Sequence, residues 1–402
     1  MFLGSFEYRN IIYMIKTKDF PEIIFDEIGP EYIVQIYDPE LEFRGVLVID
    51  NLNLGVGKGG IRMMPNITVT EVFRLARAMT FKNALAGLPF GGAKSGIVVD
   101  AKKISREKKE AIIRSFSRYL RAFSPKYYIA APDMSTGEQE MQWFADENGS
   151  WKSATGKPAK YCLESFGGKD KKCGIPHEFG STGFGVAEAT RVAADFAGLN
   201  IRGATVAIAG FGNVGSFAAK YLGEMGAQVV AVSDSRGAIT SDNGMDFKKL
   251  IAIKNKGGSV TEYPKGKKIA LDKIYELDVD ILIPASSPDV INSKNVNKVR
   301  AKIISEGANI SIPDDFAETL HNKGILIVPD IVANAGGVIS SYAEYRGYNP
   351  KRMLETVRTR MIKNVRSVLK KTKKENKSPR GVAIKMARTK VLDSRSKSLI
   401  KR

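Results

Sequence analysis

A chain of 402 residues is too long for one ordinary core and predicts two domains. Its apolar fraction of 43% and charged fraction of 26% are typical of a soluble globular protein, and no apolar stretch approaches the roughly 20 residues that span a bilayer. The net charge of +19 gathers late in the chain, over 370–374 and at Lys401 and Arg402. Without a nucleic-acid motif or interleaved aromatic residues, this charge favours a solvated helix face over nucleic-acid or membrane-surface binding.

Two features bear on the cellular compartment. Charged and polar residues at 7, 9 and 10 interrupt the apolar N-terminus, so no signal peptide is expected and a cytoplasmic location is predicted, with Met14 as an alternative start. Two cysteines in so long a chain, Cys162 and Cys173, favour a reducing cytosol over a disulfide scaffold. A zinc pair is the alternative, but His177 is the only histidine nearby.

The first half of the chain predicts a mixed α/β domain, at 1–180. In chain order, the patterns indicate a strand over 45–49, a helix over 70–86, a helix over 105–123 and a strand over 127–130. The stretch 153–181, rich in Gly, Lys and Pro, is the expected crossing between domains.

The second half predicts a parallel sheet wound with helices, in a domain at 181–345. Short runs rich in Val and Ile alternate with helical patterns, and each run is followed by Gly, Pro, Asp or Asn. These runs cover 204–209, 229–232, 279–283, 302–304 and 325–328.

The glycines Gly210, Gly212 and Gly215 form G-x-G-x-x-G after the first of these runs and open a helix that is expected to end near Met225. The first glycine allows the tight turn, the second lets the backbone approach a pyrophosphate, and the third lets helix and strand pack closely. The helix N-terminus then supplies amide donors for phosphates. A purely structural glycine turn is the alternative.

The choice of nicotinamide cofactor depends on the end of the next strand. Asp234 lies about twenty residues past the glycines and suits the ribose hydroxyls of NAD. Ser233, Ser235 and Arg236 flank it, however, and Arg236 is able to pair with a 2′-phosphate. Dual use of NAD and NADP, or a preference for NADP, is therefore open.

Three lysines in the first half predict a cationic pocket for a small dianion. Lys82 lies on the apolar face of the helix over 70–86, where it must either snorkel to water or meet an anion. Lys94 and Lys58 each lie among glycines, so a ligand can come close to both backbone and ammonium. Burial near other cations would lower the pKa of such a lysine and suit it to general acid or base work. For either of these two alone, a surface loop is the alternative.

Asp133 follows the strand over 127–130 and a rigid proline. A carboxylate held at this place suits proton transfer to or from an amine. The alternative is a cap on the next helix, which is expected to begin near Gly137.

Seven motifs together resemble the glutamate/leucine/phenylalanine/valine dehydrogenase family between about residues 30 and 350. They cover 57–65, 79–97, 131–136, 210–215, 284–285, 306–309 and 334–338. The resemblance implies an α/β fold with an N-terminal substrate domain, a Rossmann-type doubly wound dinucleotide-binding domain, and a deep cleft between them. It also implies last helices, here 346–402, that pack back on the first domain, and a homohexamer.

The resemblance implies roles for the matching residues. Lys94 resembles the catalytic lysine, Asp133 the proton-relaying aspartate and Lys82 the ligand of the substrate α-carboxylate. Lys58 and Ser341 fall where glutamate-specific members hold the second carboxylate. The remaining matches are Gly59, Met79 and Asn334 near the substrate, and Thr182, Phe211, Asn213, Val214 and Asn309 near NAD(P), with no metal.

Several positions depart from the family pattern and are expected to line the cleft, where they bear on turnover and cofactor preference more than on fold. Ser95 and Ser135 replace glycines, and Gly137 replaces an asparagine. The other departures lie at 174–181, 286–289 and 310–311, where Ile310 and Ser311 replace a glycine-proline pair.

The predicted function is NAD(P)-dependent, reversible oxidative deamination of L-glutamate to 2-oxoglutarate and ammonium. A dehydrogenase of a branched or aromatic amino acid is one alternative, although it would lack Lys58 and Ser341, because an aliphatic side chain leaves a buried ammonium unpaired. The other alternative is a regulatory paralogue that binds nucleotide and has lost catalysis, although it would lack Lys94 or Asp133.

Overall fold

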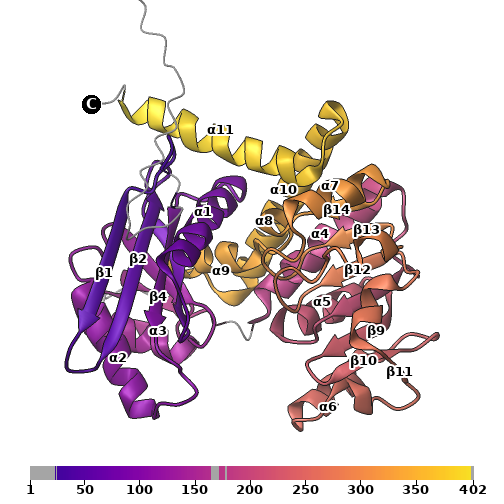
Figure 1. Cartoon of the computed structure of the whole chain (residues 1–402), viewed down its shortest axis with the longest axis horizontal. Coiled ribbons are helices and arrows are strands. Elements are labelled where there is room, and N and C mark those ends of the chain that lie inside the picture. Colours follow the sequence, from indigo (N-terminus) through magenta and orange to yellow (C-terminus); the bar gives the residue numbers. More distant parts are fainter. Residues whose placement is uncertain (1–22, 24, 164–171, 177–178, 400–402) are drawn as a thin grey trace, which may run out of the picture.

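The computed structural model describes residues 23, 25–163, 172–176 and 179–399. The alternative start at Met14, the zinc candidate His177 and the terminal Lys401 and Arg402 lie outside this part. Two sheets, each covered by helices, lie side by side with α9 (Gly336–Tyr345) between them (Figure 1). Within the described part, no helix is long and apolar enough to cross a membrane.

The first sheet has five strands in the order β1-β2-β4-β3-β5. They are β1 (Tyr32–Asp38), β2 (Phe43–Asn51), β3 (Gly57–Met63), β4 (Gly91–Val98) and β5 (Tyr128–Pro132). The pairs β1–β2 and β2–β4 are antiparallel, whereas β3 runs parallel to both β4 and β5. The predicted strands over 45–49 and 127–130 are confirmed.

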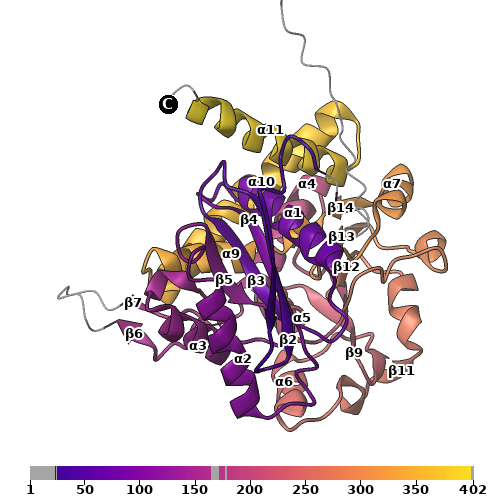
Figure 2. The same cartoon turned by 60° about the vertical axis from the view of Figure 1, so that its left-hand side comes forward.

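Helices cover both faces of this sheet, because successive residues of a strand point to opposite faces. On β2, Val46 and Val48 pack with α1 (Val69–Leu85), whereas Leu47 and Ile49 belong to the cluster of α2 (Arg106–Tyr119) and α3 (Glu138–Asn148). The helices predicted over 70–86 and 105–123 are therefore present, and Figure 2 shows α1 lying along the sheet.

The second sheet has seven strands in the order β11-β10-β9-β8-β12-β13-β14. The predicted runs form its parallel strands: β8 (Thr205–Ala209), β9 (Gln228–Asp234), β12 (Ile281–Pro284), β13 (Ile303–Ser305) and β14 (Leu326–Val328). The antiparallel strands β10 (Gly237–Thr240) and β11 (Lys267–Ile269) extend one edge. The helices are α4 (Ser181–Ala197), α5 (Asn213–Glu224), α6 (Phe247–Asn255) and α7 (Asp314–Asn322), with short 3₁₀ turns at 260–262, 271–276 and 296–298. A further 3₁₀ turn, at 151–153, follows α3 in the first half.

The order of this sheet fixes the place of a ligand. From β8 the chain pairs first with β9 on one side and later with β12 on the other. In an open α/β sheet, ligands bind beyond the carboxyl ends of the strands where the order reverses in this way. The crevice is therefore expected beside Gly210 and Ala285, which follow β8 and β12.

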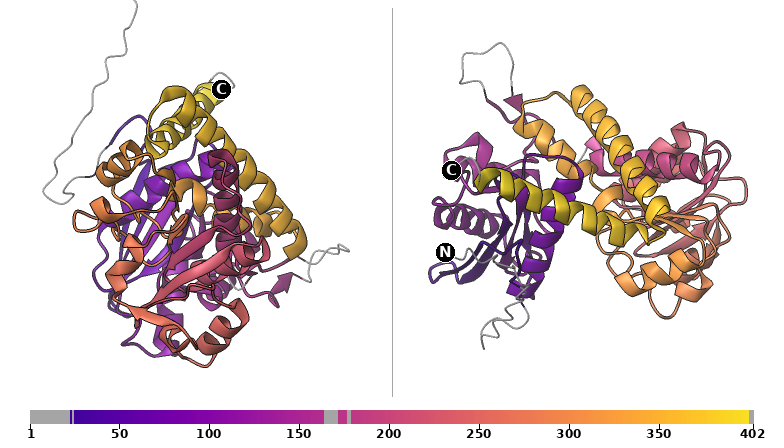
Figure 3. Two further views of the ribbon diagram at one scale, coloured as in Figure 1. Left: turned by 90° about the vertical axis from the view of Figure 1, so that its right-hand side faces the viewer. Right: turned by 90° about the horizontal axis from the view of Figure 1, so that it is seen from above.

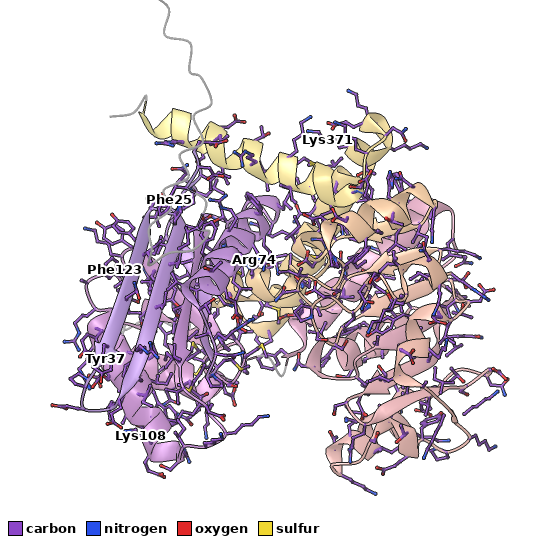
Figure 4. All side chains as sticks on the ribbon, viewed as in Figure 1. Phe25, Tyr37, Arg74, Lys108, Phe123 and Lys371 are labelled. Atoms are coloured by element: carbon purple, nitrogen blue, oxygen red, sulfur yellow. A yellow bond between two sulfur atoms is a disulfide. The ribbon has the colours of Figure 1, made fainter. Side chains whose placement is uncertain are left out.

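The last helices connect the two halves. They are α8 (Asp330–Ala333), α9, α10 (Pro350–Glu375) and α11 (Pro379–Leu399). Seen from above, α11 runs from the second half across the first (Figure 3), where Ser394 donates a 2.8 Å hydrogen bond to the Asn53 carbonyl. The basic run lies at the end of α10, where Lys371 is labelled in Figure 4, and exposed Lys370, Lys373 and Lys374 agree with a solvated helix face.

The two cysteines were expected to indicate a reducing cytosol and not a disulfide scaffold, but the structure pairs them. Cys162 and Cys173 are direct partners in a hairpin of β6 (Cys162–Leu163) and β7 (Lys172–Cys173), and their sulfur atoms form a disulfide. Directly opposite residues of an antiparallel pair lie close enough for this bond. A separation of eleven residues in sequence gives no sign of that register.

Candidate active site

A cavity of about 610 Å³ lies between the two halves and collects most of the predicted site residues. The first half contributes side chains from β3, β4, α1 and the end of β5, and the second half contributes the segments that follow β8, β12 and β13, together with α4 and α9. Predicted residues that line this cleft are Lys58, Met79, Lys82, Lys94, Asp133, Thr182, Asn213, Val214, Asn309, Asn334 and Ser341.

Lys94 lies in β4 and forms a direct ion pair with Asp133. Burial lowers the pKa of Lys94 well below its usual range, and the charges of Arg62, Lys82 and Lys58 lower it further. The loop alternative is wrong for both Lys94 and Lys58, because the glycines around them belong to adjacent strands. A lowered pKa favours the neutral amine, which is the form of a lysine that accepts a proton.

Asp133 is held by two basic side chains at the end of β5. Besides Lys94, Arg62 donates to it from Nη2 at 3.2 Å and pairs with Glu71 at 2.7 Å. The alternative role as a helix cap is wrong, because the Gly137 amide at the start of α3 bonds instead to Glu140, at 2.7 Å. Asp133 therefore does not cap α3, and it faces the cleft beside Lys94.

Arg62 is a cleft residue that was not predicted from the sequence, although the alternation of side chains along β3 indicates it. Positions 58, 60 and 62 alternate along one strand and so share a face. Lys58, Gly60 and Arg62 all line the cleft. Gly59 points the other way, where a Cβ atom would lie 1.6 Å from the Ala93 carbonyl oxygen, so its assignment to the substrate site is not supported and Gly60 takes its place.

Lys82 links the two halves of the molecule. Its ammonium donates to Asn334 Oδ1 at 2.6 Å and to Asn309 Oδ1 at 3.0 Å. Burial lowers its pKa, and Asp330 opposes that shift. Lys82 does not snorkel, because it is 7% exposed and its partners are both cleft residues.

Lys58 lies deepest of the cleft lysines, at 1% exposure. Its ammonium donates to the Ala130 carbonyl at 2.8 Å, and no carboxylate of the described residues lies within ion-pair distance of it. Burial lowers the pKa of Lys58 to about 7. The negative charge of Glu344 opposes this shift, and the positive charge of Lys157 adds to it. A buried, partly satisfied cation of this kind favours an incoming anion.

The glycine turn fits a dinucleotide. Gly210 has φ 112°, and a Cβ at Gly215 would lie 1.9 Å from the Gly210 carbonyl oxygen, as the tight turn and close packing require. A Cβ at Gly212 would meet nothing within 4 Å, which leaves the start of α5 open to a phosphate. The Phe211 side chain is buried in the core, so this residue offers only backbone to a cofactor.

Asp234 has its carboxylate occupied by protein donors. It accepts hydrogen bonds from Lys254 at 2.8 Å, the Arg236 amide at 2.9 Å, and Ser259 and the Val260 amide at 3.0 Å. Burial raises the pKa of Asp234, but these hydrogen bonds outweigh it and hold the pKa at about 2. The corner therefore offers little free carboxylate to a ribose.

Lys254 at this corner is a second residue that the sequence analysis missed, because it lies on α6, twenty positions from Asp234. Lys254 and Arg236 are cations and Asp234 is an anion, so the corner carries one net positive charge. Ser235 and Arg236 are exposed beside it. Such a corner suits a 2′-phosphate better than a bare hydroxyl pair.

Most departures from the family pattern do not line the cleft, contrary to expectation. Ser95, on β4, is buried, with its hydroxyl 2.9 Å from Tyr128 Oη. Ser135 and Ile310 have φ of 60° and 53°, so each places a side chain where the family glycine would meet no strain. The cleft is lined instead by parts of the two other departures, namely Ile175, Pro176, Ser181, Ser286, Ser287 and Pro288.

Comparisons with known proteins agree with this geometry. The model of the Glutamate/Leucine/Phenylalanine/Valine dehydrogenase family matches residues 173–398, and the model of the Glu/Leu/Phe/Val dehydrogenase dimerisation domain matches 30–149. Glutamate dehydrogenase of Aeropyrum pernix is 41% identical over 358 residues, which are 84% of this chain and 82% of that protein. NADP-specific glutamate dehydrogenase of Saccharolobus shibatae is 43% identical over 326 residues, which are 79% of this chain and 75% of that protein.

A similar solved structure is the hetero-hexameric glutamate dehydrogenase from Thermus thermophilus in its Leu-bound form. It is 28% identical with a TM-score of 0.80, and the match covers 91% of this chain and 89% of that one. The two family models, the two relatives and the arrangement of the cleft lead to one conclusion. The chain belongs to the Glu/Leu/Phe/Val dehydrogenase family.

Proposed function

We propose that this protein catalyses the NAD(P)-dependent, reversible oxidative deamination of L-glutamate to 2-oxoglutarate and ammonium. The observation that carries the proposal is the set of three buried lysines in one cleft, Lys58, Lys82 and Lys94. Binding and oxidation of a dicarboxylic amino acid require two groups that bind the carboxylates and one that transfers protons. Relatives at 41% and 43% identity bear the name glutamate dehydrogenase, which supports this choice.

In this proposal Lys82 binds the α-carboxylate, and Lys58 with Ser341 binds the second carboxylate. Two such contacts fix the substrate, and fixed geometry lowers the barrier by removing rotational freedom. A nicotinamide cofactor held in this cleft would supply the acceptor for the Cα hydride. Loss of the hydride leaves an iminium ion. Lys94 takes a proton from the water that attacks the iminium carbon and then stabilises the carbinolamine oxygen, while Asp133 carries protons to and from the nitrogen.

The cofactor site favours NADP in this proposal and accepts NAD as well. The name of the Saccharolobus shibatae relative includes NADP specificity. The occupied carboxylate of Asp234 and the cations Lys254 and Arg236 support the same preference. We infer that Thr182 and Asn213, which line the cleft, lie beside the nicotinamide carboxamide.

We infer further that the chain forms a homohexamer in the cytoplasm, with domains at 1–180 and 181–345 and C-terminal helices at 346–402. Support for assembly comes from the neighbour named as hetero-hexameric and from the edge of the first sheet, which pairs with no further strand of the described residues. Strand β1 forms this edge, and Tyr37 on it is 62% exposed (Figure 4). An exposed edge strand with an aromatic side chain suits pairing with another chain.

Initial rates test the proposal. We expect oxidation of NADPH, faster than of NADH, with ammonium and 2-oxoglutarate, and little with 4-methyl-2-oxopentanoate or phenylpyruvate. Lys94→Ala should lower kcat by about 10²- to 10⁴-fold, the usual value of a general acid or base, without weakening NADPH binding. Preference for an apolar oxo acid would contradict the glutamate assignment, and tight NADPH binding without turnover would identify the regulatory alternative.

A further inference from the structure

Behind Lys58 lies a buried ion pair that the proposed reaction does not use. Lys157 and Glu344 are both fully buried, and Lys157 Nζ lies 2.6 Å from Glu344 Oε1. Lys157 also donates to the carbonyls of Trp151, at 3.2 Å, and Ala154, and its ammonium lies 3.9 Å from the centre of the Trp151 ring. Burial of an ion pair costs free energy of desolvation, which favours a role other than stability for this pair.

Glu344 joins three segments that meet at the Lys58 end of the cleft. Its second carboxylate oxygen accepts hydrogen bonds from the amides of Gly156, at 2.7 Å, and Ile175, at 2.9 Å. Gly156 and Ile175 both line the cleft, and so does Ser341, one turn before Glu344 on α9. One carboxylate therefore fixes α9, and with it Ser341, against the segments that form this end of the cleft.

The segment that carries Lys157 is also tied to Lys58 through β5. The Ala130 carbonyl accepts both the Lys58 ammonium, at 2.8 Å, and the Thr155 amide, at 3.0 Å. Charged groups that act on Lys58 are Glu344 from α9, Lys157 from this segment, and Lys94 from β4, which is paired with Asp133. The buried group of Lys58, Lys157 and Glu344 thus carries one net positive charge, which one added carboxylate would neutralise.

We propose that Glu344 and Lys157 are positioning residues that make this end of the cleft selective for a substrate with one second carboxylate. Glu344 places Ser341 beside Lys58 and favours the protonated form of Lys58, and Lys157 neutralises Glu344 so that it does not repel the substrate. This inference rests on the proposed function, because it concerns how the same cleft recognises 2-oxoglutarate.

The test compares 2-oxoglutarate with 2-oxopentanoate, which has a methyl group in place of the second carboxylate. The quantity measured is the ratio of kcat/KM for the two oxo acids. Glu344→Gln should lower this ratio by about tenfold or more, the usual value of a contact with a charged group. The matched control is Glu188→Gln on α4, because Glu188 is buried and paired with Arg191 and Arg358 but does not line the cleft. The ratio of kcat/KM values for Glu188→Gln should equal that of the wild-type protein.

The pH dependence separates this role from a merely structural one. The pH at which KM for 2-oxoglutarate begins to rise should move down in Glu344→Gln, because Lys58 loses a nearby negative charge. It should move up in Lys157→Met, because Lys58 loses a nearby positive charge. Loss of packing alone does not predict opposite shifts in the two variants. Shifts in the same direction, or no shift, would therefore overturn the inference.

Removal of one partner from a buried pair can prevent folding. The double variant Lys157→Met with Glu344→Leu replaces the pair by apolar groups of similar size. The two charge effects on Lys58 then cancel, but the Gly156 and Ile175 amides lose their acceptor and α9 its anchor, so the ratio should still fall by about tenfold. An unchanged ratio in this variant would overturn the inference. If the wild-type protein itself does not prefer 2-oxoglutarate over 2-oxopentanoate, the proposed function fails instead, and the two failures are thus distinguishable.

Discussion

The glycines of β3 and β4 differ in purpose from those of the turn before α5. In the two strands the backbone is extended, and a side chain is excluded because other atoms come so close: a Cβ at Gly92 would lie 2.0 Å from Thr80 Oγ1. At the turn, Gly210 adopts a left-handed backbone and Gly212 has open space in front of it. Glycine thus serves close packing in one region, and a tight turn with ligand access in the other.

This difference explains the contrast between the two binding regions. The lysines on β3 and β4 are held in a dense core, and burial lowers the pKa of both Lys58 and Lys94. The phosphate region after β8 is instead an open helix N-terminus that works through backbone amides. Substitutions in the first region should therefore change folding and proton chemistry, whereas those in the second should change cofactor affinity.

The largest effect is expected for Gly59→Ala. The new Cβ atom would lie 1.6 Å from the Ala93 carbonyl oxygen, so β3 and β4 would have to separate. We expect a loss of about 3 kcal/mol or more of stability, seen as a lower thermal midpoint or insoluble protein. The control is Gly223→Ala in α5, where a Cβ atom meets nothing within 4 Å and should be neutral or stabilising. Equal behaviour of the two variants would contradict the packing role.

Gly212→Ala should instead weaken cofactor binding and leave stability unchanged. No atom lies within 4 Å of its added Cβ, so the thermal midpoint should stay within about one degree of the wild-type value, as for a surface substitution. The methyl group would occupy space that the pyrophosphate needs, and the dissociation constant of NADPH should rise by about tenfold or more. Titration of protein fluorescence with NADPH measures it, and unchanged affinity would show that the dinucleotide does not approach this turn.

Lys254→Met sharpens the comparison within the cofactor region. Loss of this cation should raise KM for NADPH by about tenfold and leave KM for NADH nearly unchanged, because only NADPH carries the 2′-phosphate. Lys273→Met is the matched control, since Lys273 is an exposed lysine of the same half that pairs with Glu276. A parallel loss for both cofactors would show that Lys254 acts on the fold of the corner instead.

The smallest effect concerns a glycine that this chain has replaced. Ser135 has φ 60° and an exposed side chain whose hydroxyl makes one weak hydrogen bond, at 3.9 Å to Met64 Sδ, so Ser135→Gly removes backbone strain and loses little contact. We expect a gain of about 0.5–1 kcal/mol in the free energy of unfolding, measured by denaturant titration. A loss of stability would mean that the serine makes a contact worth more than the strain.

Periodicity predicted the fold well, because strands and helices with one buried face have patterns of two and 3.6 residues. The five parallel runs of the second half and the two helices of the first follow such patterns. The glycine-rich strands β3 and β4 do not, since glycine has no side chain to alternate, and their lysines therefore looked like loop residues. Contacts between distant segments were also out of reach: Lys254 meets Asp234 from another helix, and Cys162 meets Cys173 through a hairpin register.

The most direct test of the account is the pH dependence of KM for 2-oxoglutarate, measured beside 2-oxopentanoate at saturating NADPH and ammonium. Burial lowers the pKa of Lys58 to about 7, so the ammonium is present below that pH and is lost above it. KM for 2-oxoglutarate should therefore rise as the pH increases through 7 to 9, relative to KM for 2-oxopentanoate, which has no second carboxylate. A constant ratio of the two KM values across this range would contradict the claim that Lys58 binds the second carboxylate.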